Sequence, residues 1–139
     1  MKRVFDFLFS IILIIILFIP SIFIAILIRI TSEGKVLHWS ERIGKNNIKF
    51  KMPKFRTMKI NTPQLATHLF QNSSNALTPI GNFLRKYSLD EIPQLWSILK
   101  GDMSFVGPRP ALFNQYDLIK LRSTHGVEKI LPGLTGWAQ

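Results

Sequence analysis

The stretch that decides the fold is FLFSIILIIILFIPSIFIAILI, residues 7–28, in which two serines and one proline interrupt an otherwise apolar run of 22 residues. At about 1.5 Å per residue, a helix of this length would measure roughly 33 Å, enough to cross the hydrocarbon core of a bilayer. A cleaved signal peptide fits poorly, because the run is too long and Ile28-Arg29-Ile30 offers no small-residue cleavage site. The sequence therefore predicts a protein that resides at a membrane.

The charges around this run leave two topologies open. Basic residues lie at both of its ends: Lys2, Arg3 and Arg29. Positive residues prefer the cytoplasmic side, so a re-entrant hairpin would keep both ends there, whereas a straight span would place one end outside. Pro20 lacks an N–H and clashes with the carbonyl of Ile16, which predicts a break, and Ser21 is a candidate to satisfy the freed carbonyl. Charge and proline alone do not choose between the two topologies.

Most of the basic excess follows the apolar run directly. The 139 residues carry a formal net charge of +10 and no cysteine, which excludes a disulfide framework, a thiolate metal site and a cysteine nucleophile. Residues 34–63 hold eight Lys or Arg residues against Glu41 alone. This charge suits a phosphate, a lipid headgroup or a nucleic acid. Nucleic acid is disfavoured, because the basic residues gather beside the membrane segment and no recognition motif accompanies them.

A β-hairpin is predicted after the apolar run. Residues 36–39 and 48–52 are short runs rich in aromatic and β-branched residues, and the turn between them contains Gly44, Asn46 and Asn47. Alternation along the second run places Lys49 and Lys51 on one face. Residues 61–77 are polar and without periodicity, so we expect a loop with one helical turn at most.

The first helix after this loop is predicted to begin at Thr78, with Thr78 as N-cap and Pro79 as the first helical residue. A second helix is predicted with Asp90 as N-cap, because Pro93 then occupies a position whose N–H is unpaired anyway, and Gly101 closes it. Both helices carry apolar residues at i, i+3, i+4 and i+7: Ile80, Phe83, Leu84 and Tyr87, then Ile92, Leu95, Trp96 and Leu99.

The C-terminal third combines a rigid loop with a further helix. Two prolines flank Arg109 in Gly107-Pro108-Arg109-Pro110, which holds the arginine on an extended loop. A third helix is predicted from about residue 111 to 121, with Leu112, Tyr116 and Ile119 on one side. Residues 131–137 read as a turn-rich end.

The adjacent carboxylates Asp90 and Glu91 form the candidate chemical site. A helix N-terminus and nearby cations lower the pKa of a carboxyl group and keep it ionised, and an ionised aspartate can attack phosphorus. Phosphoryl transfer also needs cations that hold the phosphate oxygens, often with Mg²⁺. The sequence supplies Lys54, Arg56, Arg85 and Arg109. Taken alone, such an acidic pair is usually a helix cap, and these features define only a membrane-surface phosphate-binding protein.

Five motifs in a fixed order add a family resemblance. They are KRVFD (residues 2–6), KFRTM (54–58), GNFLRKYSLDEIPQL (81–95), GDMSFVGPRP (101–110) and PGLTGWAQ (132–139). Together they resemble the bacterial sugar transferases, also called monotopic phosphoglycosyl transferases. The resemblance covers nearly the whole chain.

This resemblance implies an α+β, mainly helical fold with two parts. Residues 1–30 would form a re-entrant membrane hairpin broken at Pro20 and Ser21. Residues 31–139 would form a catalytic domain, with a small β-hairpin and amphipathic helices packed at the membrane surface. That domain would face the cytoplasm at the bacterial inner membrane, and further residues after Gln139 would complete its site.

The resemblance also implies a reaction. The enzyme would transfer a sugar 1-phosphate from a UDP-sugar to a polyprenyl (undecaprenyl) phosphate, through a phosphosugar carried on Asp90. Glu91 would take part in acid–base work, and Asp90 and Glu91 would handle Mg²⁺. Lys54, Arg85 and Arg109 would hold phosphates. The product would begin assembly of an exopolysaccharide, capsule, O-antigen or glycoprotein glycan, and a homodimer is compatible with this scheme. The alternative is an inactive, truncated relative that binds polyprenyl phosphate or a partner enzyme without turnover.

Overall fold

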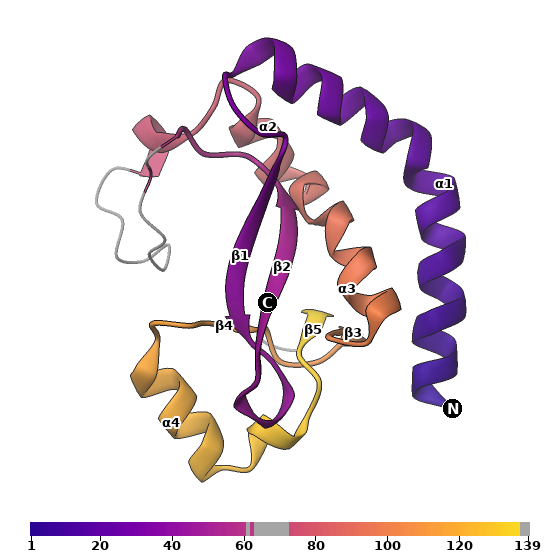
Figure 1. Ribbon diagram of the computed structural model, residues 1–139, viewed down its shortest axis with the longest axis vertical. Coiled ribbons are helices and arrows are strands. Elements are labelled where there is room, and N and C mark those ends of the chain that lie inside the picture. The colour runs from indigo at the N-terminus through magenta and orange to yellow at the C-terminus, as the bar shows by residue number, and fades with distance from the viewer. Residues whose placement is uncertain (61, 63–72, 137–139) are drawn as a thin grey trace.

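The computed structural model describes residues 1–60, 62 and 73–136, which form an α+β fold (Figure 1). Short 3₁₀ helices cover Lys45–Asn47, Ser73–Ala76, Leu89–Gln94 and Val127–Lys129. The other elements are α1 (Lys2–Thr31), β1 (Leu37–Ile43), β2 (Lys49–Phe55), α2 (Gly81–Lys86), α3 (Leu95–Lys100), β3 (Ser104–Val106), β4 (Ala111–Leu112), α4 (Tyr116–Thr124) and β5 (Gly133–Thr135). The described residues that follow α1 are here called the body of the protein.

Helix α1 is long, apolar and bent. Among the described residues it is the one helix that length and composition would allow to cross a membrane. Figure 1 shows that it bends partway along its length, and Pro20 lies inside it. The hydroxyl of Ser21, one candidate for the carbonyl of Ile16, donates instead to the carbonyl of Leu17 at 2.6 Å. A serine side chain inside a helix commonly donates to the carbonyl four residues earlier, and Ser21 does so.

The N-terminal end of α1 is bound to the body by buried polar contacts. The Asp6 carboxylate is buried and accepts a hydrogen bond from the Ser104 hydroxyl at 2.8 Å and another from the amide of Phe105 at 3.3 Å. The Arg3 guanidinium donates to the carbonyls of Ile98 and Leu99, in the last turn of α3. Arg3 thereby satisfies carbonyls that the end of a helix leaves unpaired.

The C-terminal end of α1 is bound to the same body by apolar packing. Ile24 and Ile28 are buried in a cluster with Phe55 of β2 and Leu84 of α2. Both ends of the helix therefore lie against one body, and Figure 1 shows α1 arching past α2 and α3.

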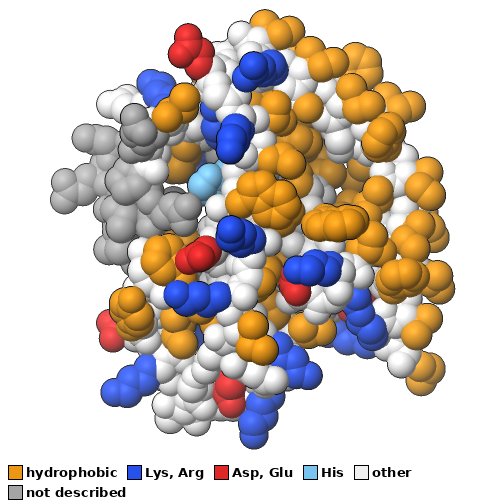
Figure 2. Space-filling model, in the orientation of Figure 1, with side chains coloured by type: hydrophobic (Ala, Val, Ile, Leu, Met, Phe, Trp, Pro, Cys, Tyr) orange, Lys and Arg blue, Asp and Glu red, His pale blue; other side chains and the backbone are white. Residues whose placement is uncertain are grey.

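The outward surface of α1 is apolar between its basic ends. Figure 2 shows hydrophobic side chains following the helix, whereas Lys and Arg gather over the body. The large exposed hydrophobic residues of α1 are Val4, Phe5, Phe7, Leu8, Phe9, Ile12, Ile15, Ile16, Phe18, Ile19, Ile22, Phe23, Ile26, Leu27 and Ile30. An apolar surface of this extent indicates contact with a membrane or another apolar partner.

The predicted β-hairpin is confirmed. Strands β1 and β2 pair antiparallel, and Asn46 and Asn47 take positive φ values of 55° and 58° in the turn between them. Residues directly opposite each other share a face of the ribbon, so the pair His38 and Lys54 lies on the same face as Arg42. This register decides which cations of the hairpin can meet.

The helices begin at different residues from those predicted. The helix expected at Thr78 begins at Gly81, and the Thr78 hydroxyl donates to the carbonyl of Thr57 instead of capping the helix. Ser88 adopts the left-handed conformation, with φ 55°, immediately before the 3₁₀ helix Leu89–Gln94. Asp90 consequently lies in the first turn of that 3₁₀ helix, and its prediction as an N-cap was wrong.

The apolar stripe predicted for the second helix does not form one buried face. A 3₁₀ helix has about three residues per turn instead of 3.6, and this shifts the phase of the α3 helix that follows it. Leu95 and Ile98 are buried and pack with Met52 and Met103, whereas Trp96 is 56% exposed.

The predicted helix at residues 111–121 is replaced by two elements. Strand β4 pairs with β1 through Arg42 opposite Leu112, and α4 begins only at Tyr116. The C-terminal segment that was predicted to be rich in turns contains β5, which pairs parallel with β3. The loop prediction for residues 61–77 falls mostly on positions 61 and 63–72, which lie outside the described residues, and a 3₁₀ turn covers Ser73–Ala76.

Candidate phosphate-binding site

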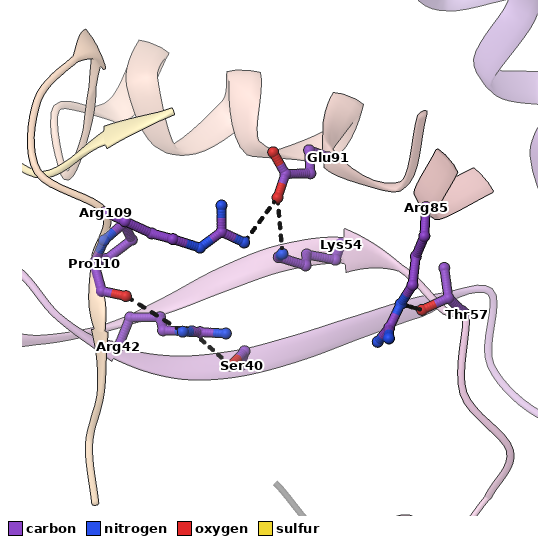
Figure 3. A network of polar contacts seen from close by, with 8 residues as sticks. All are labelled: Ser40, Arg42, Lys54, Thr57, Arg85, Glu91, Arg109 and Pro110. Carbon is purple, nitrogen blue, oxygen red and sulfur yellow. Dashed lines mark hydrogen bonds and ion pairs between the residues drawn. The ribbon is translucent and has the colours of Figure 1, made fainter. Parts of the chain in front are cut away.

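Two cations share one carboxylate oxygen at the centre of the site (Figure 3). The 3₁₀ helix that carries Asp90 and Glu91 packs against β2, which carries Lys54 near its end. Oε1 of Glu91 lies 3.1 Å from Nζ of Lys54 and 3.1 Å from Nη2 of Arg109. Glu91 thus joins the hairpin to the loop at residues 107–110.

Asp90 is the more buried carboxylate, with 7% of its surface exposed. No cation among the described residues lies within ion-pair distance of its oxygens. Burial raises the pKa of Asp90, and so does the repulsion of Glu91. The attraction of Lys54 and Arg85 lowers this pKa only in part, so the net pKa of Asp90 is raised. The sequence predicted a lowered pKa, and this was wrong because burial outweighs the nearby cations.

The pKa of Glu91 is displaced in the other direction. Burial raises it, but the charges and hydrogen bonds of Lys54 and Arg109 outweigh burial, and the net pKa of Glu91 is lowered. Two adjacent carboxyl groups with pKa values pushed apart are typical of sites where the groups have different roles.

Arg109 is held by a tightly packed loop. The amide of Gly107 donates to the carbonyl of Thr135, and the amide of Gly133 donates to the carbonyl of Pro108. A Cβ at Gly107 would collide with the backbone at residues 131–133, so this close approach requires glycine. On the outer side, Nη1 of Arg122 donates to the carbonyl of Arg109 at 2.7 Å.

Arg85 marks the other end of the site. It lies in the last turn of α2, and its Nε donates to the Thr57 hydroxyl at 3.0 Å. Figure 3 shows Arg85 at one end of the polar network and Arg109 and Arg42 at the other, with Lys54 and Glu91 between them. Arg85 is also one of the two cations that lower the pKa of Asp90.

The structure does not bring Arg56, which the sequence placed among the phosphate-binding residues, into the network of Lys54, Glu91 and Arg109. The Arg56 guanidinium is buried and binds the carbonyl and hydroxyl of Ser32 and the carbonyl of Glu33. Arg56 and Lys54 are two positions apart, but Arg56 follows the last residue of β2, where strand alternation no longer fixes the direction of the side chain.

Sequence reasoning missed Arg42 and gave His38 no role. Nε of Arg42 donates to the Ser40 hydroxyl at 3.0 Å, and Nη1 donates to the carbonyl of Pro110 at 3.2 Å. The pKa of His38 is lowered by burial and then by the charges of Arg42 and Lys54. Alternation along the hairpin could have found both residues, once the register of Lys54 against β1 was known.

The charges of this site do not balance. Arg42, Lys54, Arg85 and Arg109 contribute +4, and Asp90 and Glu91 contribute −2, which leaves +2. An excess of converging cations in a partly buried place favours an anionic ligand, and arginine forks match the oxygens of phosphate.

The residues present also fit a magnesium ion that is shared with phosphate. No group of three or more His, Cys, Asp or Glu side chains that could hold a metal occurs in the part of the chain that the structure describes. Mg²⁺, however, usually takes only one or two carboxylates together with substrate phosphates. The Asp90 carboxylate and the second oxygen of Glu91 are outside the ion pairs and could serve in this way.

A basic site around two carboxylates, carried beside a long apolar helix, is typical of proteins that bind anions at a membrane. The family model of the bacterial sugar transferases matches residues 1–139. The chain belongs to this family.

Several relatives are named as transferases that act on undecaprenyl phosphate. The chain is 38% identical over 119 residues to the UDP-N-acetylgalactosamine-undecaprenyl-phosphate N-acetylgalactosaminephosphotransferase of Aeromonas hydrophila, covering 83% of this chain and 28% of the relative. It is 40% identical over 119 residues to the UDP-glucose:undecaprenyl-phosphate glucose-1-phosphate transferase of Escherichia coli K12, covering 84% and 25%. It is 42% identical over 110 residues to the putative undecaprenyl-phosphate N-acetylgalactosaminyl 1-phosphate transferase of Bacillus subtilis, covering 78% of this chain and 61% of the relative. The matches to the first two thus span about a quarter of those relatives' length.

Proposed function

We propose that this chain carries the catalytic site of an enzyme that transfers a sugar 1-phosphate from a UDP-sugar to polyprenyl phosphate. One observation carries the proposal: the buried Asp90 carboxylate is free of ion pairs while Lys54 and Arg85 act on it. A carboxylate that is tied to no cation keeps its electron pair available, and the cations are available for phosphate oxygens. The names of the relatives favour the same reaction.

In the first proposed step, an oxygen of the Asp90 carboxylate attacks the sugar-bearing phosphorus of the UDP-sugar. A bond forms between this oxygen and phosphorus, and the bond from phosphorus to the bridging oxygen breaks. The electron pair leaves with uridine monophosphate. Lys54 and Arg85 neutralise the oxygens of the attacked phosphate, while Glu91 orients Lys54 and Arg109. Bound Mg²⁺, held by one oxygen of Asp90 and the second oxygen of Glu91, would supply further neutralisation of phosphate charge and leave the other Asp90 oxygen for the attack.

In the second proposed step, an oxygen of polyprenyl phosphate attacks the phosphorus that is held on Asp90. The new bond joins the two phosphates, and the bond to the aspartate oxygen breaks and restores the carboxylate. The product is a polyprenyl diphosphate sugar, which would begin assembly of an exopolysaccharide, capsule, O-antigen or glycoprotein glycan.

We further propose that α1 enters and leaves the membrane on one side. Asp6 at one end and Ile28 at the other both contact the body, and a body that stays in water keeps both ends on its own side. In this arrangement residues 1–30 form the re-entrant segment. Residues 31–139 form a catalytic domain on the cytoplasmic face of the bacterial inner membrane, the side that positive flanks favour.

A radiolabel assay tests the enzyme proposal. The full chain in nanodiscs is given a panel of UDP-sugars labelled in the sugar, with and without polyprenyl phosphate. We expect label on the protein without acceptor and on the lipid with acceptor, and loss of both in Asp90→Asn. Asp102→Asn is the matched control, because Asp102 pairs with Lys100 at 3.0 Å, away from the site. Absence of transfer by the wild type with every sugar would favour a binding protein without turnover.

A further inference from the structure

Arg42 is anchored at two of its nitrogens and open at the third. Its Nε and Nη1 donate to Ser40 and to the carbonyl of Pro110, as described above. Nη2 has no hydrogen-bond partner among the described residues, and it is not a buried atom. A guanidinium that is fixed on one edge and open on the other is prepared for a ligand with planar or tetrahedral oxygens.

Arg42 lies beside the loop of Arg109, and whereas Arg109 pairs with Glu91, Arg42 has no carboxylate partner of its own among the described residues. Arg42 binds the carbonyl of Pro110, the residue that follows Arg109, and no carboxylate among the described residues lies within 4.0 Å of Arg42. Burial and then the charge of Arg109 lower the pKa of Arg42 to about 10, and the attraction of Glu91 only partly offsets this. Two like charges held together in this way are stabilised when an anion lies between them.

The position of this pair separates it from Asp90. Figure 3 shows Arg42 and Arg109 at one end of the network and Arg85 at the other. Asp90 responds to Lys54 and Arg85, and neither Arg42 nor Arg109 is among the charges that shift it. The site therefore has two cationic ends, which suits a ligand with two linked phosphates.

We propose that Arg42 is a further phosphate-binding residue, which together with Arg109 holds the phosphate of the departing uridine monophosphate. The attacked, sugar-bearing phosphate then lies at the other end, between Lys54 and Arg85. This inference rests on the proposed function for the identity of the nucleotide. It assigns to Arg42 direct contact with the ligand.

A purely positional role for Arg42 is the competing explanation. Arg42 could act only by holding the carbonyl of Pro110 and thereby the loop of Arg109. The chain offers a matched control, because Arg122 holds the carbonyl of Arg109 in the same loop. Lys51 offers a second control, because it is an exposed cation of β2 on the opposite face of the ribbon from Arg42.

The test is calorimetric binding of uridine monophosphate, with uridine as the ligand that lacks phosphate, to the full chain in nanodiscs. We expect Arg42→Gln to weaken uridine monophosphate binding at least about tenfold, as for loss of a hydrogen bond to a charged group, and to leave uridine binding unchanged. Arg42→Lys keeps the charge but not the fork, and we expect an intermediate loss. Arg122→Gln and Lys51→Gln should each change the affinity by less than about threefold. A thermal melt of each variant verifies folding, and Arg42→Lys remains decisive if Arg42→Gln does not fold.

Equal losses in Arg42→Gln and Arg122→Gln would overturn the inference in favour of loop positioning. So would equal losses for uridine and its monophosphate, or a wild type that does not bind the monophosphate. The two proposals fail separately. Transfer by the wild type with unchanged nucleotide affinity in Arg42→Gln and Arg42→Lys would remove only the Arg42 subsite. Nucleotide affinity that depends on Arg42, in a wild type without transfer, would remove only the transferase.

Discussion

Asp90 and Glu91 are neighbours in one turn of 3₁₀ helix, yet the pKa values of their carboxyl groups are displaced in opposite directions. Burial dominates at Asp90, where no cation forms an ion pair. At Glu91, Lys54 and Arg109 outweigh burial. The turn therefore separates a carboxylate that organises cations from one that is available for chemistry.

A titration of the two carboxyl groups by ¹³C NMR should detect this difference directly. The midpoint of Asp90 is expected above the ordinary aspartate value and that of Glu91 below the ordinary glutamate value. Attack needs ionised Asp90, so transfer should decline as the pH falls through this raised midpoint. Lys54→Gln removes the largest lowering influence and should move the midpoint of Asp90 further upward. A midpoint of Asp90 below that of Glu91 would contradict the assignment of roles.

Replacing Glu91 should destabilise the fold. Glu91→Gln leaves Lys54, whose side chain is 15% exposed, without its ion-pair partner. The expected loss is about 2 kcal/mol in the free energy of unfolding, measured by denaturant titration at neutral pH. Because the folded pKa of Glu91 is lowered, its contribution is present above the pKa of the unfolded state and disappears as the pH falls through the folded pKa.

Glu33→Gln is the matched control for this measurement, since Glu33 is exposed and its backbone carbonyl, not its side chain, binds Arg56. A change within about 0.5 kcal/mol is expected there. Equal stability of the two variants would show that the shared carboxylate oxygen contributes nothing to the fold.

Arg56 should behave as a structural arginine. Arg56→Lys loses the fork that joins Ser32 and Glu33 to the end of β2, so we expect a lower melting temperature. Uridine monophosphate affinity, measured on the folded variant below its melting temperature, should stay within about threefold of wild type, because the guanidinium is already bound to Ser32 and Glu33. Arg109→Lys is the comparison, with a weaker affinity and little change in melting temperature. A loss of affinity in Arg56→Lys as large as that in Arg109→Lys would return Arg56 to the phosphate site.

The absence of cysteine makes the membrane topology simple to test. Single-cysteine variants Val4→Cys and Lys35→Cys flank the apolar run of residues 7–28, and Ile19→Cys lies within this run beside Pro20. With a re-entrant helix, a membrane-impermeant maleimide should label positions 4 and 35 in inverted vesicles and neither position in intact cells. Position 19 should remain unlabelled in both preparations. Labelling of position 4 and position 35 from opposite sides would establish a spanning helix instead.

The parts of the fold that depend on neighbouring residues followed from the sequence. The β-hairpin was predicted because Asn46 and Asn47 tolerate positive φ and the flanking runs alternate. Arg109 was predicted on a rigid loop because prolines flank it. These signals are local, and nothing distant competes with them.

The parts that depend on distant contacts did not follow. Pairing with β1 draws Ala111 and Leu112 out of the predicted helix, and that pairing partner lies about seventy positions earlier. The α-helical spacing placed Trp96 in one apolar stripe with Leu95, but the 3₁₀ turn at Leu89–Gln94 changes the helical phase, and Trp96 is exposed.

The sequence predicted which residue types form the candidate site better than it predicted how these residues are arranged. Glu91, Lys54 and Arg109 do meet, as the family motifs implied. The raised pKa of Asp90 was missed because burial belongs to the tertiary structure. Arg42 was missed because only the strand register reveals that it lies on the face of Lys54.

The hydrogen bond between Ser104 and Asp6 also sets an order of events during synthesis. Asp6 is translated 98 residues before Ser104, its partner. At about 5–20 residues per second, this separation is a delay on the order of 5–20 s. Throughout that interval the Asp6 carboxylate, at the start of the apolar helix α1, is without its hydrogen-bond partner. The N-terminal end of α1 can be fixed to the body only after Ser104 has been translated.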